Sequence, residues 1–340
     1  AFFTQLCAFF VLCDFKNTKN AIYIQKSTPN NTQKQAYLST FTNSNTRPTG
    51  RPLHTTRPTT ILPSILSRNT HGSSLVKIGN TQVLTGITLL VGHPGPLTPT
   101  HGDVDLSINL SPLSSQDYNV AGRLLPIVTE GEMSRSRTTS PRGYVDVHAL
   151  ESLVQRILRT SSLLNPNELC IQVGLSAWRV QITCMVLNHD GNLEDACLLG
   201  AVSALLDLKL PAVKIDMKGG GNGVVQIVSP SYDHEEDDMT EETKDANRIT
   251  KLTIQKGTIP ISLTMGIYDN HKILVDMTRE EEVVCKGVVT VVVTTTGEIV
   301  SLTKCGGLAM SPEDMAACVH LAIGRAKEVE ELLLSLDEAS

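Results

Sequence analysis

One turn in this sequence, just before a predicted helix, is placed where it could bind an anion such as phosphate. His189-Asp190-Gly191 forms a turn after a predicted strand, and a helix is predicted from Glu194 to Leu206. The free N–H groups of a helix N-terminus can hold a phosphate. Here the turn has no arginine, and two carboxylates satisfy the helix dipole and would repel an anion by about 1 kcal/mol or more each. We therefore expect the capped start of a helix here, and not a phosphate site. The residues concerned are Gly191, Asn192, Leu193, Glu194 and Asp195.

A second group of acids follows a predicted strand that ends at Asp276. Glu280, Glu281 and Glu282 come shortly after it. Carboxylates grouped in this way either bind a metal ion or form a solvated turn. A single aspartate at a strand end, followed by consecutive glutamates, more often forms a solvated turn. We therefore expect an exposed acidic turn and no metal site.

Arginines in irregular segments are candidates for binding anions. The polar stretch 114–143 predicts a loop or insertion, and arginines on such a loop can contact the phosphates of a nucleic acid without reading its sequence. A solvated surface loop is the alternative. Residues 40–60 predict an extended segment whose arginines could instead bind carboxylates of a neighbouring subunit. The candidates for such phosphate contacts are Arg123, Arg135, Arg137 and Arg142, and the arginines of the extended segment are Arg47, Arg51 and Arg57.

The sequence lacks the motifs of nucleotide-binding loops, serine hydrolases and metal sites. The Gly-rich residues 219–223 lack the lysine of a phosphate-binding loop, and no G-x-S-x-G is present. The nine histidines and eight cysteines do not have metal-ligand spacings. We expect no metal and no cofactor, mostly buried reduced thiols, and a core position for Trp178.

Strands and helices alternate around these residues, in the order strands, helix, strands, helix. This order indicates an α/β (α+β) fold of two similar β-α halves in one domain. The apolar strand 288–296 is expected to need a partner surface, because uncovered strands tend to pair or aggregate. Strands are predicted at 75–78, 83–90, 103–110, 169–173, 178–187, 213–215, 261–267, 272–276, 288–296 and 299–302, and helices at 145–164, at 194–206 and from Pro312 behind a Ser311 N-cap.

Composition limits the possible functions. The chain has 340 residues, and 41% hydrophobic residues are enough for a core. A net charge of −6 argues against a generally basic nucleic-acid binder. The longest apolar runs are too short to predict a membrane span. We predict an N-terminal extension over residues 1–36 and one domain over 37–340, with an acidic loop insertion at about 230–248.

Four ordered segments resemble the RNase PH family, specifically the eukaryotic exosome ring subunits. They are Arg47-Pro48-Thr49-Gly50-Arg51-Pro52 and residues 72–81, 190–196 and 276–282. The closest resemblance is to a ring member without catalytic activity. The family resemblance implies an RNase PH-type fold and a six-membered ring around an RNA channel, with RNA-binding cap proteins on one face.

Compared with active members of that family, both parts of the phosphorolytic site are degenerate. Active members hold phosphate in a G-G-T-R-T-type turn, whose arginine is missing between Gly191 and Asp195. They also place aspartates two and six residues after the position of Asp276, where this chain has Thr278 and Glu282. The resemblance therefore implies that the chain has no catalytic residues of its own.

The sequence thus predicts a non-catalytic structural subunit of the exosome core ring. It would scaffold the ring and line the RNA channel for 3′–5′ RNA processing and degradation, including ribosomal RNA maturation. Expected partners are other ring subunits, RNA-binding cap subunits, exosome-associated hydrolytic nucleases and RNA bound without sequence preference. The expected location is the nucleus and nucleolus, and also the cytoplasm. The alternatives are an active phosphate-dependent 3′–5′ exoribonuclease and a free-standing interaction protein.

Overall fold

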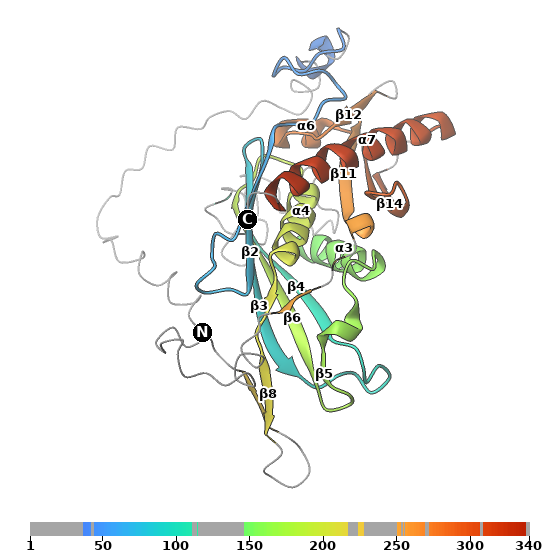
Figure 1. Ribbon diagram of the computed structural model, residues 1–340. Coiled ribbons are helices and arrows are strands. Elements are labelled where there is room, and N and C mark those ends of the chain that lie inside the picture. The colour runs from blue at the N-terminus through green and yellow to red at the C-terminus, as the bar shows by residue number, and fades with distance from the viewer. Residues whose placement is uncertain are drawn as a thin grey trace, which may run out of the picture.

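Two sheets and two layers of helices alternate through the structure, a computed structural model (Figure 1). The extension 1–36, the four candidate RNA-binding arginines and the acidic insertion all lie outside the described residues. The described residues are 37–41, 44–110, 114, 146–216, 224–227, 250–252, 254, 256–268, 272–306 and 309–337.

The first sheet is built around the predicted hairpin of β2 and β3. β3 pairs antiparallel with β6, and β6 pairs parallel with β4. Helix α3 joins β4 to β6 and packs on β4, as the crossover of a parallel pair requires. In sheet order the strands are β1 (Thr59–Pro63), β2 (Gly72–Ile78), β3 (Thr81–Gly92), β6 (Ser176–Asn188) and β4 (Asp103–Leu110), with β5 (Cys170–Gln172) paired to β6; α3 spans Val147–Thr160.

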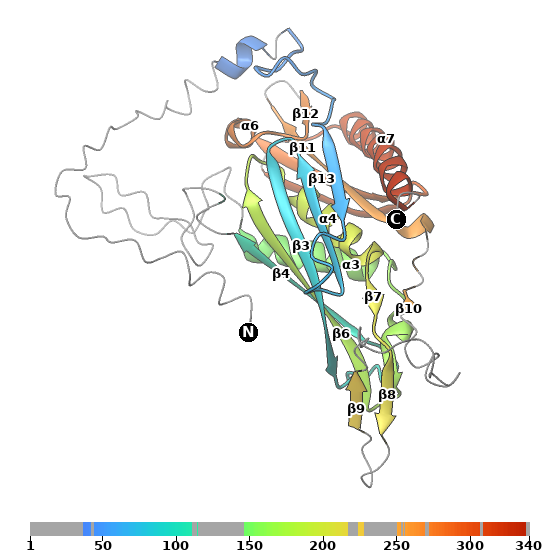
Figure 2. The same ribbon diagram turned by 60° about the vertical axis from the view of Figure 1, so that its left-hand side comes forward.

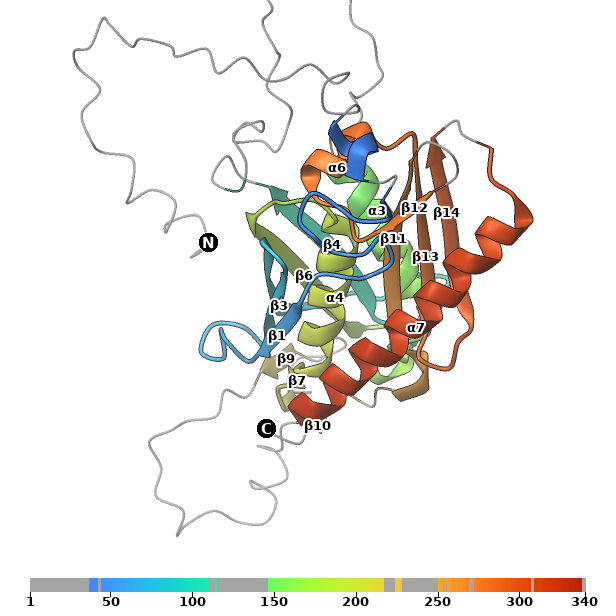
Figure 3. The same cartoon turned by 90° about the horizontal axis from the view of Figure 1, so that it is seen from above.

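The second sheet has the order β12-β11-β13-β14 and is covered on its outer face by α7 (Figure 3). Ser311 caps α7 as predicted, because its Oγ accepts a hydrogen bond from Asp314 N at 3.1 Å. The expectation that the apolar 288–296 strand needs a partner is wrong, since β13 is buried between β11 and β14. The elements are β11 (Pro260–Ile267), β12 (Ile273–Val275), β13 (Gly287–Thr294), β14 (Ile299–Gly306) and α7 (Pro312–Asp337).

Helix α4 (Leu193–Leu206) lies between the two sheets and packs on β2, β3 and β11. Twelve of its residues are buried, and its apolar side chains point in all directions. A helix with this sequence has no face suited to water, so it becomes the centre of the core. The turn that precedes α4 is consequently held at the junction of the two halves.

The remaining elements are short. Two small ribbons extend from the end of the first sheet (Figure 2). One pairs β7 (Lys209–Leu210) with β10 (Thr250–Lys251), and the other pairs β8 (Val213–Asp216) with β9 (Val224–Ile227). The 3₁₀ helices are η1 (Pro166–Leu169) and η3 (Lys256–Thr258).

Most predicted elements are confirmed within a few residues, and the differences have local causes. β1 was not predicted, because the pattern TTILP is too short to separate from the extended segment before it. The first half is not simply strands followed by a helix, since α3 lies between β4 and β5. Trp178 is a core residue as predicted. No helix in the described part of the chain is long and apolar enough to cross a bilayer.

Candidate functional site

The two segments with candidate chemistry meet at the junction of the halves. Gly191 has a φ of +81°, and a Cβ there would lie 2.6 Å from both Arg279 N and Met277 O. Only glycine permits this approach. Asn192 and Asp276 are also left-handed, with φ of 55° and 53°, a conformation that Asn and Asp tolerate better than most residues. The segments around Gly191 and Asp276 therefore lie side by side in the structure.

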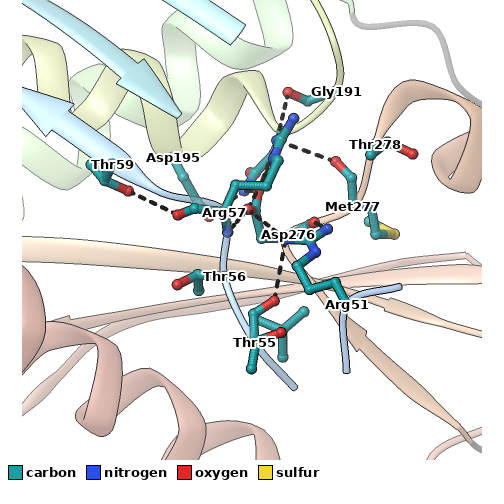
Figure 4. Close-up of polar contacts among 12 residues, drawn as sticks. Arg51, Thr55, Thr56, Arg57, Thr59, Gly191, Asp195, Asp276, Met277 and Thr278 are labelled. Carbon is teal, nitrogen blue, oxygen red and sulfur yellow. Dashed lines mark hydrogen bonds and ion pairs between the residues drawn. The ribbon is translucent and has the colours of Figure 1, made fainter. Parts of the chain in front are cut away.

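Arg57 places its guanidinium directly against Asp276 (Figure 4). Its Nε and main-chain N donate to Asp276 Oδ2 at 3.0 and 2.7 Å, and its Nη2 donates to Oδ1 at 2.8 Å. The terminal nitrogens also donate to the carbonyls of Asp190 at 2.8 Å and Gly191 at 3.3 Å. Every guanidinium nitrogen is thus used by a partner in the same chain.

The carboxylate of Asp276 is saturated by donors. Besides Arg57, Asn192 Nδ2 donates to Oδ1 at 2.7 Å and Arg51 Nη1 donates to Oδ2 at 3.3 Å. A carboxylate offers about four lone-pair sites, so a metal ion would have to displace one of these donors. Burial alone would raise the pKa of Asp276, but the hydrogen bonds and charge of Arg57 outweigh it and hold the pKa below its usual value.

The two acids of the predicted phosphate-site turn do not cap α4. Asp195 accepts hydrogen bonds from Thr264 N and Thr264 Oγ1, both at 2.9 Å. Glu194 accepts from Thr290 Oγ1 at 2.5 Å. These bonds tie the first turn of α4 to β11 and β13. Burial raises the pKa of both carboxyls. The expected well-capped helix is therefore wrong in detail, and Asn192 makes no side-chain cap bond.

The predicted exposed acidic turn after Asp276 is also wrong. Residues Arg279–Val284 form helix α6, capped by a reciprocal pair of bonds between Thr278 and Glu281. Asp276 is 1% exposed and Glu281 is 2% exposed. The pattern Thr-x-x-Glu is the signature of a capping box and was the available signal for this helix.

Glu282 occupies the N-terminus of α4. Its Oε1 accepts a hydrogen bond from Asn192 N at 2.6 Å, so a carboxylate from α6 lies at the N-terminus of α4, the end of a helix that favours anions. Burial raises the pKa of Glu282 to about 7. The sequence marked Glu282 as a departure from the catalytic pattern but did not show that its side chain reaches the N-terminus of α4.

Arg47, Arg51 and Arg57 all bind carboxylates of their own chain, and the expectation that they bind carboxylates of a neighbouring subunit is wrong. Arg47 is 1% exposed. Its Nη1 donates to Glu281 Oε2 at 3.1 Å, and its Nη2 donates to the carbonyls of Leu53 and Val275. The segment 44–57, which we call the N-terminal arm, is thereby fastened to β12 and α6.

Comparison with known proteins identifies the family. The sequence matches the 3′ exoribonuclease family, domain 1, over residues 55–211 and domain 2 over residues 258–325. The chain therefore belongs to the RNase PH family of 3′ exoribonucleases, and its fold is of the RNase PH type. The two degenerate segments come from different matched domains, because Gly191 lies in the first and Asp276 in the second.

Archaeal exosome proteins are among its relatives. The chain is 31% identical to the exosome complex component Rrp42 of Pyrococcus furiosus over 266 residues, which cover 78% of this chain and 79% of that protein. It is 31% identical to Rrp42 of Methanopyrus kandleri, over 82% of this chain and 88% of that one. A chain of the Archaeoglobus fulgidus exosome, solved with RNA bound to the active site, superposes with a TM-score of 0.66 at 26% identity, covering 88% of this chain and 98% of that one.

Proposed function

We propose that this protein is a non-catalytic subunit of an exosome core ring. The relatives are exosome components, and the observation that carries the non-catalytic part is the internal filling of the phosphate position. Glu282 accepts the N–H of Asn192 at 2.6 Å, and Arg57 donates all its nitrogens to Asp276 and nearby carbonyls.

Phosphorolysis requires an anion cradle beside the RNA 3′ end. A cradle is built from free N–H groups and an arginine. In this chain both kinds of group are present at the junction, but each is already bonded internally. Recruiting Arg57 would break a buried ion pair with Asp276, which costs about 3–5 kcal/mol. A phosphate would also have to displace the carboxylate of Glu282.

The decisive experiment is a phosphorolysis assay on the full chain. Purified protein is incubated with a single-stranded RNA, with and without inorganic phosphate, and nucleoside diphosphate release is measured. We expect release no faster than from RNA alone, while an active family member run in parallel releases nucleoside diphosphates. Phosphate-dependent release by this chain would instead establish the alternative, an active 3′–5′ exoribonuclease.

The finer assignment within the ring is part of the same proposal. The four ordered motifs support a subunit of the ribosomal RNA-processing protein 43 type, acting in ribosomal RNA maturation in the nucleus and nucleolus and also in the cytoplasm. Its partners would be other RNase PH-like subunits, RNA-binding caps and hydrolytic nucleases. Native mass spectrometry of the complex purified with the tagged chain tests this. Isolation as a lone chain would favour a free-standing interaction protein.

The outer edge of β14 is a surface suited to a neighbouring ring subunit. β14 is the last strand of its sheet in the described residues, and a groove of about 490 Å³ runs between it and α3. Leu302 is 41% exposed beside this groove. Exposed apolar side chains on a strand edge are typical of interfaces. Leu302→Glu should reduce co-purification with ring partners, and Leu97→Glu, at a 95% exposed position outside the groove, should not.

RNA contact is proposed for the arginines outside the described residues, Arg123, Arg135, Arg137 and Arg142. Phosphate contacts are sequence-blind, and each one lost should flatten the dependence of log K on log salt by about 0.7 for single strands. The triple change of Arg135, Arg137 and Arg142 to alanine in the reconstituted complex should weaken several RNA sequences equally. Unchanged affinity and slope would remove these residues from the RNA path.

A further inference from the structure

The groove of about 490 Å³ between β14 and α3 follows the free edge of a strand. β14 ends the second sheet, pairs only with β13 within the described residues, and has no buried residue among its eight (Figure 3). Five consecutive residues, 300–304, line the groove. Because successive side chains of a strand point to opposite faces, a groove that touches all five runs along the edge of the strand and not over one face.

The main chain along this edge is open for pairing. An edge strand leaves about half of its N–H and C=O groups without a partner in the sheet. For residues 300–304, no main-chain hydrogen bond outside the sheet is found in the described part of the chain. Five residues of a strand span about 17 Å. The groove therefore has the length and the donors and acceptors that a second, short extended segment needs.

The groove is positively charged, although the net charge of the chain is −6. Arg156 is exposed, and no ion pair is found for it among the described residues, whereas Arg159 on the same helix pairs with Asp103. Lys304 Nζ donates to the carbonyl oxygen of Gly306 at 3.2 Å, which leaves its charge without a carboxylate. No acid is among the described residues that line the groove. An acidic occupant is therefore favoured.

The residues around the groove favour a protein segment over RNA. No aromatic side chain is among the described residues that line it, so RNA bases would have no stacking platform. A nucleic acid also has no peptide groups that could pair with β14. A second copy of β14 would bring another lysine and no carboxylate. The hydroxyl groups of Thr160, Ser301 and Thr303 add donors that a carboxylate can use.

We propose that the neighbouring ring subunit places an extended acidic segment in this groove. The segment adds a strand to β14 and sets one carboxylate against Arg156 and one against Lys304. An apolar side chain of the same segment covers Leu302, which is 41% exposed. This inference rests on the proposed function, because it names the contact by which the chain joins its neighbour in the ring.

Charge reversal in the full chain tests the electrostatic part of the proposal. The complex that purifies with the tagged chain is measured by native mass spectrometry for the parent and for the double variant Arg156→Glu, Lys304→Glu. The variant should retain about tenfold less of the neighbouring subunit, because two attractive pairs become repulsive. The neutral double variant Arg156→Gln, Lys304→Gln should lose less. Added salt should weaken the parent complex more than the neutral one, since salt screens charged pairs.

The matched control is the double variant Arg68→Glu, Lys209→Glu. Both residues are exposed, neither lines the groove, and the net charge changes by the same amount. The control should retain the neighbour as the parent does, and all variants should unfold at the urea concentration of the parent. Equal losses in the control and the groove variant would overturn the proposal. An intact ring with weakened RNA binding in the groove variant would show that the groove binds RNA, and would also overturn it.

Cross-linking and hydrogen exchange test the position of the segment. A carbodiimide joins a lysine amine directly to a carboxyl group in contact with it, so Lys304 should become linked to an aspartate or glutamate of the neighbouring subunit. The amides of residues 300–304 should exchange more slowly in the complex than in the free chain, because an added strand protects them. A Lys304 link to an acid of its own chain, or unchanged exchange, would overturn the proposal.

The outcomes also separate this proposal from the proposed function. A parent chain that purifies alone would refute both. Phosphate-dependent release of nucleoside diphosphates by a chain that holds its neighbour through Lys304 would refute only the non-catalytic function. A ring that keeps its neighbour after charge reversal would refute only the acidic segment in the groove.

Discussion

The stability of this protein should depend on the charge of one glutamate, Glu282. Its carboxyl is half-buried between α6 and the start of α4, and it faces Arg57, Arg279, Glu194 and Asp276. Burial raises its pKa from 4.5 to about 7. Because the folded state holds the proton more tightly than the unfolded state, its stabilising contribution is complete below pH 4.5. That contribution is lost as the pH rises through 7.

The size of this stabilising contribution follows from the pKa shift of Glu282. One pKa unit is worth about 1.4 kcal/mol, so the full contribution is at most about 3.5 kcal/mol, of which about 2.5 kcal/mol is lost between pH 5 and pH 8. Water that reaches the half-buried carboxyl reduces this to about 1–2.5 kcal/mol. Glu282→Gln keeps an oxygen that can accept from Asn192 N but stays neutral at every pH. The variant should therefore gain stability relative to the parent as the pH rises.

Urea unfolding of both proteins from pH 5 to pH 8 measures this difference. The parent and the variant share all other titrating groups, so the change in their difference with pH isolates Glu282. Glu280→Gln is the matched control, because Glu280 is exposed on the same helix. The difference in unfolding free energy between Glu280→Gln and the parent should stay the same from pH 5 to pH 8. A Glu282→Gln difference that stays constant within about 0.5 kcal/mol over this range would refute the reasoning.

Two further substitutions, each compared with a control substitution, test the packing of the junction. Arg57→Ala leaves the buried carboxylate of Asp276 short of its main partner and should lower the free energy of unfolding by about 3–5 kcal/mol. Arg159→Ala, which breaks an exposed pair with Asp103, should lower it by less than about 1 kcal/mol, and equal losses would contradict a special role for Arg57. Gly191→Ala should unfold the chain at much lower urea concentration, because a Cβ would meet backbone atoms at 2.6 Å. Gly50→Ala has a similar φ of +78° but no atom within 4 Å, so it should cost only about 1–2 kcal/mol.

The sequence predicts the regular elements well because their signals are local. The alternation of DVDLSINL gives β4 with the observed bounds, and the apolar run after Glu194 gives α4. The burial of β13 depends on a helix that follows it by many residues, so its apolar sequence alone could not separate a core strand from an interface. β1 was not predicted, because its five residues form a strand only by pairing with β2.

The structure brings the two predicted segments of the candidate site together, but the sequence did not predict the hydrogen bonds and ion pairs of their acidic side chains. The motifs around Gly191 and Asp276 are 85 residues apart in the chain, and family resemblance grouped them. What the sequence could not show is that Arg57 would lie between them, since a segment with Thr and Pro around its arginines carries no local signal of burial. An aspartate at a strand end that is followed by three glutamates is expected to be exposed to solvent. Only the position of Arg57 shows that Asp276 can be buried.

The arm supplies a reason why such an acidic junction is stable. Glu194, Asp195, Asp276 and Glu282 converge there, and buried carboxylates without partners would be prohibitive. Arg57 neutralises Asp276, the threonines of β11 and β13 satisfy Glu194 and Asp195, and the N–H of Asn192 binds Glu282. An active enzyme leaves such groups free for ligands that come and go. Here the same kinds of group are bonded to each other, which fixes the two halves in one arrangement, as the proposed non-catalytic function requires.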